Sequence, residues 1–270
     1  MRPRYKPLFL HFIFFVILQF AGVDAYPAPA VVVGALASFL VAITPPIPHT
    51  NQQPTLNSIV SDKYDSYSST YDRLDGSSSA SANAFGVLDL RQEASKSVHG
   101  DVLEIAIGTG LQSEYYDPKS ITSFTGIDIS EGMLEMARKK LSSTLSIVES
   151  KGLELMNAEK LRFEDEAFDT VIDTFSMCVI PNPDMAIQEM ARVVKQDGEV
   201  ILLENVKSDK EAVAIIQDVL EPLVTPISKN CKWNIDVNSF ASMHGLRLVS
   251  SERKSLGTLQ LGIYKKLLAR

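Results

Sequence analysis

The amino-acid sequence predicts an α/β fold, a doubly wound, seven-stranded, mainly parallel sheet that ends in an antiparallel closing hairpin. From residue 101 onward, short apolar runs alternate with stretches of helical periodicity. This alternation is typical of a parallel sheet with helices on both faces, joined by right-handed crossovers. The last two apolar runs, residues 246–251 and 258–267, have no helical stretch between them, which indicates the hairpin.

The individual elements follow from the same patterns. Parallel strands are expected at residues 101–106, 123–128, 152–157, 168–175 and 199–205. Helices are expected at residues 87–98, 130–141, 183–195, 209–220 and 236–243. The first of these helices should turn its charged side chains outward. Ser130 is the expected N-cap of the second, and Gly198 should lie just beyond the end of the third.

Three regions are expected along the chain: residues 1–50, 51–98 and 99–270. The first has a basic start, a charge-free run over 7–23 and a second apolar run over 30–43. In one interpretation it is a secretory-type signal ending near Ala25; in the other, one or both runs stay in a membrane, although each is no longer than the minimum of about 17 residues for a spanning helix. Residues 45–81 are rich in Pro, Ser, Asn, Gln and Tyr, which indicates a linker and a mobile cap.

Composition excludes some classes of function. The net charge is −7, and no dense basic stripe is present, which disfavours nucleic-acid binding. Cys178 and Cys231 lack the spacing of a metal site, so no metal is expected. In a domain of this size we expect both to be reduced thiols rather than a disulfide scaffold.

A nucleoside site is predicted at the carboxyl ends of the first two strands, where open parallel sheets bind ligands. Ile107-Gly108-Thr109-Gly110 follows the first strand, and its glycines allow a sharp turn and close approach of a ligand. The second strand ends at Asp128, whose carboxylate is placed to accept hydrogen bonds from ribose hydroxyls. Either feature alone has a plainer explanation, as a tight turn or a helix cap, but together they indicate a nucleoside-binding βαβ unit.

Glu104 distinguishes between two nucleoside cofactors. It is a carboxylate within an apolar strand, and a buried carboxylate needs a partner. The amino group of a methionyl moiety would supply one, whereas a pyrophosphate would be repelled. Ser113 also stands where a dinucleotide fingerprint has its third glycine. The sequence therefore favours a sulfonium nucleoside over NAD.

Four successive runs, VLEIAIGTG, FTGIDIS, LRFEDEAFDTV and ARVVKQDGEVILLEN, resemble the motifs of class I S-adenosylmethionine-dependent methyltransferases. Within that class the chain is similar to the type 11, ubiquinone/menaquinone-biosynthesis-like group, near membrane-anchored members that include thiol methyltransferases and a mitochondrial inner-membrane branch. The resemblance covers residues 64–266 and implies a Rossmann-like methyltransferase domain over 99–270 with S-adenosyl-L-methionine as cofactor.

The resemblance also implies the site residues. Those at the cofactor are Glu104, Ala106, Gly108, Thr109, Gly110, Asp128, Ile129, Met133, Asn157, Ala158 and Asp173. Those that could face the acceptor are Asp173, Phe175, Met177 and, from the cap, Tyr71. No catalytic base is assigned. Ala106 replaces the first glycine of the usual loop, and Asn157 replaces an acid.

The expected function is methylation of a small, lipophilic acceptor at oxygen, carbon or sulfur. Two alternatives stay open: a cofactor-binding but inactive scaffold protein of a membrane, favoured by Ala106 and Asn157, and a nicotinamide-dependent oxidoreductase, disfavoured by Glu104 and Ser113. The expected partners are the acceptor and a membrane, bound through the N-terminal segments. Mitochondrion, plastid and endoplasmic reticulum are the locations considered, and the sequence predicts no oligomeric state.

Overall fold

The computed structural model describes residues 55–74, 85–148, 150–228 and 230–267. The expected signal or membrane segments at residues 1–50 lie outside this part of the chain. From Leu56 onward the chain forms one compact unit. None of the helices in the described part is long and apolar enough to cross a membrane.

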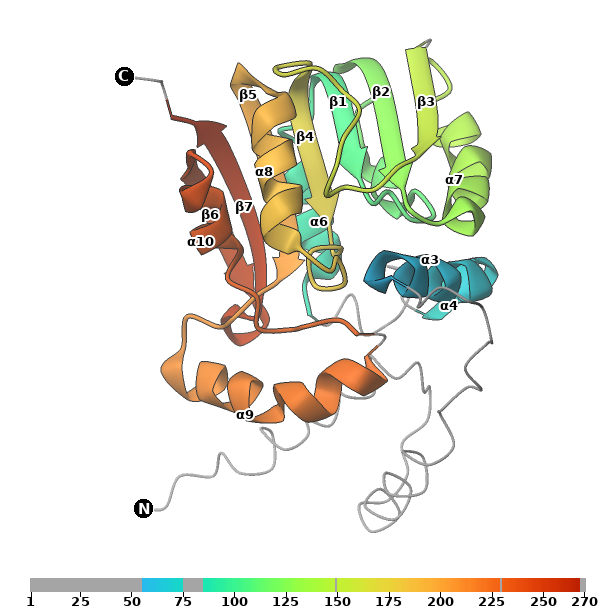
Figure 1. Ribbon diagram of the computed structural model, residues 1–270. Coiled ribbons are helices and arrows are strands. Elements are labelled where there is room, and N and C mark those ends of the chain that lie inside the picture. The colour runs from blue at the N-terminus through green and yellow to red at the C-terminus, as the bar shows by residue number, and fades with distance from the viewer. Residues whose placement is uncertain (1–54, 75–84, 149, 229, 268–270) are drawn as a thin grey trace. The chain divides into compact units, whose positions relative to one another are not determined.

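A seven-stranded sheet forms the centre of the molecule, as predicted (Figure 1). Its strands are β1 (Gly100–Ile105), β2 (Ile121–Asp128), β3 (Ser150–Leu155), β4 (Phe168–Thr174), β5 (Val194–Asn205), β6 (Leu246–Lys254) and β7 (Leu259–Lys266). The order is β3-β2-β1-β4-β5-β7-β6, and only β7 runs antiparallel to its neighbours. The strand order therefore changes direction between β1 and β4, the switch point at which α/β folds bind ligands.

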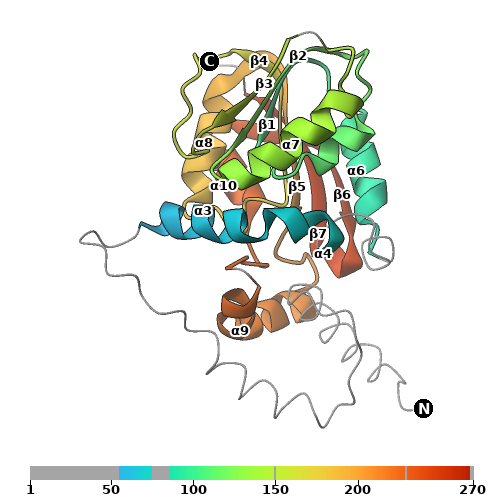
Figure 2. The same cartoon turned by 90° about the vertical axis from the view of Figure 1, so that its right-hand side faces the viewer.

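Helices cover both faces of the sheet (Figures 1 and 2). One face carries α6 (Val87–Ser95) and α7 (Glu131–Thr144), and the other carries α8 (Pro183–Val193) and α10 (Val237–Met243). A third group lies beyond the carboxyl ends of the parallel strands: α3 (Leu56–Tyr67), α4 (Tyr71–Leu74) and α9 (Glu211–Ile227). Of these helices, α3 and α4 border the predicted site.

The core on the α6 and α7 face is built from the apolar stripes of the two helices. Leu90 of α6, Leu134 and Leu141 of α7, and Phe124 of β2 are at most 4% exposed. Their spacing along the helices matches the helical repeat, which places them on one side. Ser130 caps α7 by accepting a hydrogen bond from the Met133 N–H, as expected.

Three expected elements differ in the structure. Residues 56–74 form helices rather than a linker. Gly198 lies within β5, because α8 ends at Val193 and the strand begins at the next residue. A glycine is required there, since a Cβ on Gly198 would come within 2.6 Å of the Asp169 carbonyl oxygen. The helix expected to end at Leu220 continues through two prolines to Ile227, held by the buried Gln217 and Val224.

The prediction that α6 turns all its charges outward is wrong for Arg91. Its side chain is buried, donating to Gln112 Oε1 at 3.0 Å and to Thr174 Oγ1 at 3.4 Å. Helical periodicity identifies the buried face of a helix from its apolar residues. A buried arginine on that face is therefore missed until its hydrogen-bond partners are known.

The prediction of reduced thiols is also wrong, because Cys178 and Cys231 form a disulfide. The two cysteines are 53 residues apart in sequence, with their Cα atoms 4.6 Å apart. The bond joins the loop after β4 to the segment after α9. The spacing of the two cysteines in the sequence could not predict the bond, because only the folded chain between them brings them together.

Candidate cofactor and methyl-acceptor site

The loop after β1 makes a tight left-handed turn at the edge of the sheet. Gly108 and Gly110 have φ values of 58° and 80°, and Ala106 has a φ of 46°. Glycine adopts this region freely, whereas alanine does so at a cost. The alanine at the position of the family's first glycine therefore keeps a left-handed backbone conformation.

Asp128 lies beside this loop, as the sequence predicted. Its Oδ2 accepts from the Gly108 N–H at 2.8 Å, and its Oδ1 accepts from the Ser130 N–H at 2.9 Å. The side chain is 7% exposed, and burial raises its pKa to about 6. Each carboxylate oxygen keeps a second lone pair, so the group can still accept from a diol.

The helices of the cap contact the same loops through two aspartates. Asp72 of α4 accepts from the Thr109 hydroxyl and forms an ion pair with Lys140 of α7 at 2.9 Å. Asp65 of α3 accepts from Ser130 Oγ at 2.5 Å and from the Gly132 N–H at 2.9 Å. These bonds link the cap to the glycine loop and to the N-terminus of α7, where a negative charge is stabilising.

Glu104 is fully buried on β1 and has a partner within the chain. The Tyr116 hydroxyl donates to its Oε2 at 2.8 Å. Burial raises the pKa of Glu104 to about 8, and the tyrosine bond together with the nearby Arg91 only partly offsets this. The sequence argument required a partner but did not foresee Tyr116. A neutral hydroxyl does not compensate a buried charge, so a cation would still be stabilised here.

Two further buried carboxylates lie at the ends of β4 and β5. Asp173 and Glu204 are both 0% exposed. Asp173 Oδ2 and Glu204 Oε2 have no hydrogen-bond partner elsewhere in the described part of the chain, and the two side chains interact with each other. Burial, followed by the charge of Asp173, raises the pKa of Glu204 well above its usual range, and burial also raises that of Asp173. Each of the two groups therefore holds a proton more readily than an exposed carboxyl does.

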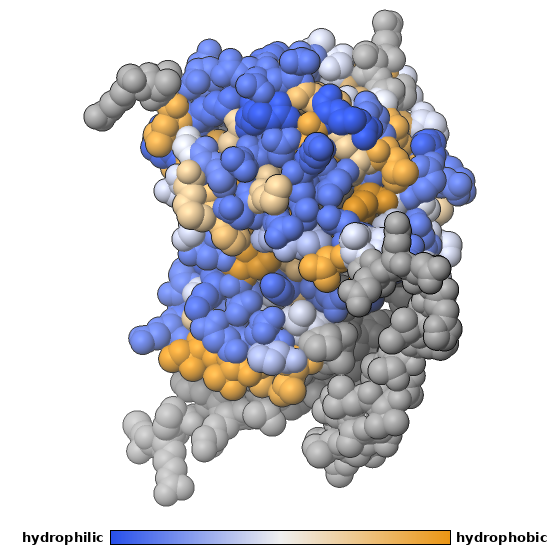
Figure 3. Space-filling view, in the orientation of Figure 1, coloured by the Kyte–Doolittle hydropathy of each residue, from blue (hydrophilic) through white to orange (hydrophobic). Residues whose placement is uncertain are grey.

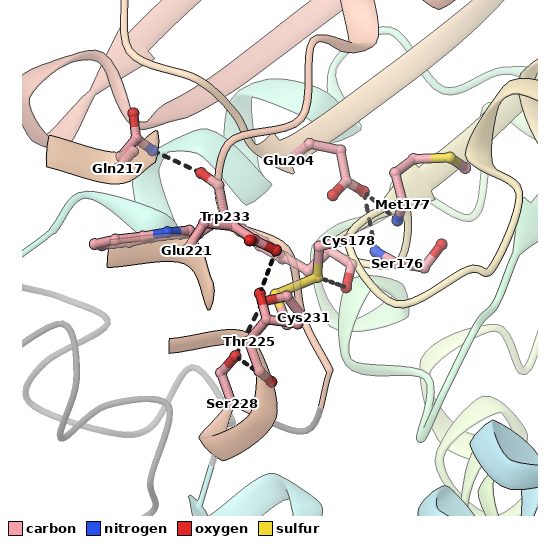
Figure 4. Close-up of a disulfide and its surroundings, with 11 residues drawn as sticks. Ser176, Met177, Cys178, Glu204, Gln217, Glu221, Thr225, Ser228, Cys231 and Trp233 are labelled. Atoms are coloured by element: carbon pink, nitrogen blue, oxygen red, sulfur yellow. Dashed lines mark hydrogen bonds between the residues drawn. A yellow bond between two sulfur atoms is a disulfide. The ribbon is translucent and has the colours of Figure 1, made fainter. Parts of the chain in front are cut away.

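Glu204 was not among the sequence-predicted site residues. Its Oε1 accepts from the Ser176 N–H at 3.0 Å and from the Met177 N–H at 3.4 Å, and so holds the loop after β4 (Figure 4). Ser176 in turn donates its hydroxyl to Asp173. A carboxylate at the end of an apolar strand was the available signal, the same one that identified Glu104.

The loop after β4 contains a second strained position. Phe175 has a φ of 62°, which is rare for a bulky residue and marks a strained backbone position. The Arg91 guanidinium lies 5.1 Å from the centroid of its ring. Met177, expected to face an acceptor, is fully buried, and Cys178 is fixed by its disulfide to Cys231 (Figure 4).

The remaining predicted residues lie around β2 and β3. Asn157 uses its Oδ1 to accept from the Glu159 N–H at 2.9 Å, and Ala158 is buried behind it. Met133 is buried in α7, while Ile129 is half-buried and its carbonyl accepts from Ser61 of the cap at 3.0 Å. Tyr71, in the first turn of α4, is half-buried.

Known proteins share this domain. Residues 103–202 match the family model described as a methyltransferase domain. Over 121 residues the chain is 39% identical to phosphatidylethanolamine N-methyltransferase of Cereibacter sphaeroides, covering 45% of this chain and 58% of that protein. Over 178 residues it is 32% identical to the mitochondrial methyltransferase OMS1 of Saccharomyces cerevisiae, covering 60% of this chain and 37% of that protein. The chain thus spans less than two thirds of either relative.

Solved structures share the fold. Magnesium protoporphyrin IX methyltransferase from Synechocystis, solved with bound S-adenosylmethionine, matches with a TM-score of 0.56 and 17% identity, covering 81% of this chain and 100% of that one. The [4+2]-cyclase SpnF matches with a TM-score of 0.58 and 21% identity, covering 76% of this chain and 78% of that one. These likenesses concern the fold alone.

Proposed function

We propose that the chain is a member of the class I S-adenosylmethionine-dependent methyltransferases and that it transfers the methyl group of this cofactor to a small, lipophilic acceptor. The membership rests on the match of residues 103–202 and on the seven-stranded topology. The acceptor and the reaction are our inference from the site.

The charges of the site fit this cofactor. Its ammonium and sulfonium groups are positive, and the carboxyl ends of β1, β4 and β5 carry the buried acids Glu104, Asp173 and Glu204. Glu104 and the adjacent buried pair Asp173 and Glu204 are the observation that carries the proposal, because buried acids at one end of the sheet are stabilised by a positively charged ligand. A pyrophosphate would bring two negative charges toward the same acids, so NAD fits poorly.

Arg91 complements the acids. It is a buried guanidinium whose Nε has no partner among the described residues. In the proposed complex it holds the methionyl carboxylate, Glu104 faces the ammonium, and Asp128 accepts from the ribose hydroxyls. Asn157 has a lone pair left on Oδ1 for the adenine amine.

The cofactor, when bound, supplies both the methyl group and its leaving group, so the protein needs mainly to align the acceptor and to exclude water. The cap helices α3 and α4 are placed to exclude water, since Asp65 and Asp72 bind the loops that border the site. The segment of Phe175 to Met177, held by Glu204, shapes the acceptor side.

A lipophilic acceptor is proposed for two reasons. One relative is named for a phospholipid acceptor, phosphatidylethanolamine, and others for ubiquinone and menaquinone biosynthesis. The chain also begins with two apolar runs that would keep the domain near a membrane. The mitochondrial relative supports an organelle as the location.

The transfer of radiolabelled methyl groups to panels of lipids, quinols, phenols and thiols tests the acceptor. Label in the organic extract supports the proposal, and label only in protein contradicts it. An assay is needed because the same fold occurs in a [4+2]-cyclase. Ala106 gives the inactive-scaffold alternative little support, since the loop keeps its left-handed turn.

A further inference from the structure

Helix α9 presents an apolar face that nothing in the described part of the chain covers. Ile215, Val219 and Leu223 are 55%, 68% and 67% exposed. They recur every four residues, so they form one stripe along the helix. Figure 3 shows this stripe as a hydrophobic patch on the lower part of the molecule, over the position of α9 in Figure 1.

The orientation of α9 is fixed from its other side. Gln217 is buried and donates to the carbonyl oxygens of Val206 at 3.0 Å and of Trp233 at 2.6 Å, while its own oxygen accepts from the Ser208 N–H. Val224, two turns further along the same side, is 1% exposed. The disulfide of Cys231 holds the segment that follows. These contacts fix the rotation of α9 about its axis, so the stripe faces outward.

The same edge of the molecule exposes further apolar side chains. Both α3 and α9 lie beyond the carboxyl ends of the strands in two perpendicular views (Figures 1 and 2). Leu56 and Ile59 of α3 are 67% and 40% exposed, and Leu256, at the tip of the β6–β7 hairpin, is 42% exposed. Leu256 also has a φ of 58°, an unusual conformation for a leucine at a surface turn.

We propose that this edge, with the stripe of Ile215, Val219 and Leu223 at its centre, lies on a lipid bilayer. The N-terminal residues outside the described part of the chain end at Pro54, two positions before α3, and include the apolar runs at 7–23 and 30–43. An apolar tether thus joins the domain at the exposed edge. Lys210 directly precedes α9 and Lys232 lies in the segment that follows it, and both are exposed, so their ammonium groups can reach anionic headgroups.

A second copy of the chain is a weaker candidate for the occupant. A helix of 17 residues is about 25 Å long, and one face of it offers a few hundred Å². A stable interface needs roughly 800 Å² from each partner. Binding to a bilayer requires no such minimum area, because each apolar side chain that leaves water contributes its own favourable transfer free energy. The proposal does not require methyl transfer, so it can be tested separately from the proposed function.

Lipid quenching of a fluorophore tests the inference on the full chain bound to vesicles. The label is attached to a cysteine introduced by Val219→Cys, the native pair being closed as a disulfide. The vesicles are phosphatidylcholine with a minor fraction of phosphatidylglycerol and carry a doxyl quencher high on the acyl chain. Ser142→Cys, exposed on α7 away from the edge, provides the matched control.

We expect quenching at position 219 and none at position 142. Adding Ile215→Ser and Leu223→Ser to the 219-labelled chain should reduce the quenching, while circular dichroism stays unchanged because both side chains are exposed. The proposal is overturned if the 219 label is no more quenched than the 142 label. It is also overturned if labels at 219 quench one another in detergent without lipid, which would assign the face to a second copy.

Discussion

The Oδ2 atom of Asp128 accepts a hydrogen bond from the Gly108 N–H at 2.8 Å, which couples the acid at the end of β2 to the glycine loop after β1. The two features that the sequence identified separately are thus one structural unit. Asp128 both orders the loop and presents its remaining lone pairs to a ligand.

Replacing Asp128 tests this double role. Asp128→Ala should weaken S-adenosylhomocysteine binding by about 1–3 kcal/mol, since the ribose hydroxyls and the Gly108 N–H lose their acceptor. Asp128→Asn keeps one acceptor oxygen, and its loss should be smaller. Titration calorimetry measures both. Equal affinity of the alanine variant and the parent protein would remove Asp128 from the cofactor site.

Proton release tests the role of Glu104. Its pKa of about 8 leaves it largely protonated at pH 7, and a bound ammonium group should favour the ionised form. Binding of S-adenosylhomocysteine should therefore release a fraction of a proton at pH 7, and the affinity should rise from pH 6 to pH 8. Calorimetry in two buffers of different ionisation enthalpy measures the release.

Glu104→Gln is the control for that measurement, and it should abolish most of the proton release. The same shift affects stability. Because the pKa of folded Glu104 lies above that of the unfolded chain, its contribution to the free energy of unfolding falls as the pH rises from about 4.5 to about 8. The glutamine variant should therefore lose less stability over this range, as followed by urea denaturation. Proton release that is unchanged in the variant would contradict the assignment.

Ala106→Gly should stabilise the chain. The residue has a φ of 46°, which costs an alanine more than a glycine, and we expect a gain of about 0.5–1 kcal/mol in the free energy of unfolding. Ala212→Gly, at an exposed position in the first turn of α9, should instead bring no gain. A loss of stability in both variants, measured by urea denaturation, would show that the loop does not strain Ala106.

The disulfide should stabilise the fold by tying the segment after α9 to the loop after β4. It spans 53 residues, and breaking it by Cys178→Ala with Cys231→Ala should lower the free energy of unfolding by about 2–4 kcal/mol. A reductant should lower the stability of the parent protein and leave the double variant unchanged. Two reactive thiols in the denatured, unreduced chain would show that the bond is absent.

The sequence predicted most of the fold because its strands are apolar runs and its helices have clear start signals such as Ser130. The position predicted for Gly198 was wrong. In the sequence, a glycine that ends a helix cannot be distinguished from one that allows close packing against Asp169. The continuation of α9 depends on tertiary contacts of Gln217 that no local pattern contains.

The same distinction applies to the site. Asp128 and the glycine loop were predictable because they lie at fixed distances from strand ends. Arg91 and the Cys178–Cys231 bond were not, since each depends on a partner far away in the sequence. Glu204 gave the same signal as Glu104, a carboxylate on an apolar strand, and could have been identified by it.

Calorimetric titration of the full chain with S-adenosylhomocysteine, and separately with NAD, tests the central claim most directly. The buried acids Glu104, Asp173 and Glu204, with the glycine loop and Asp128, predict saturable binding of the first ligand and none of the second. Binding of NAD, or of neither ligand, would contradict the account of a methyltransferase cofactor site.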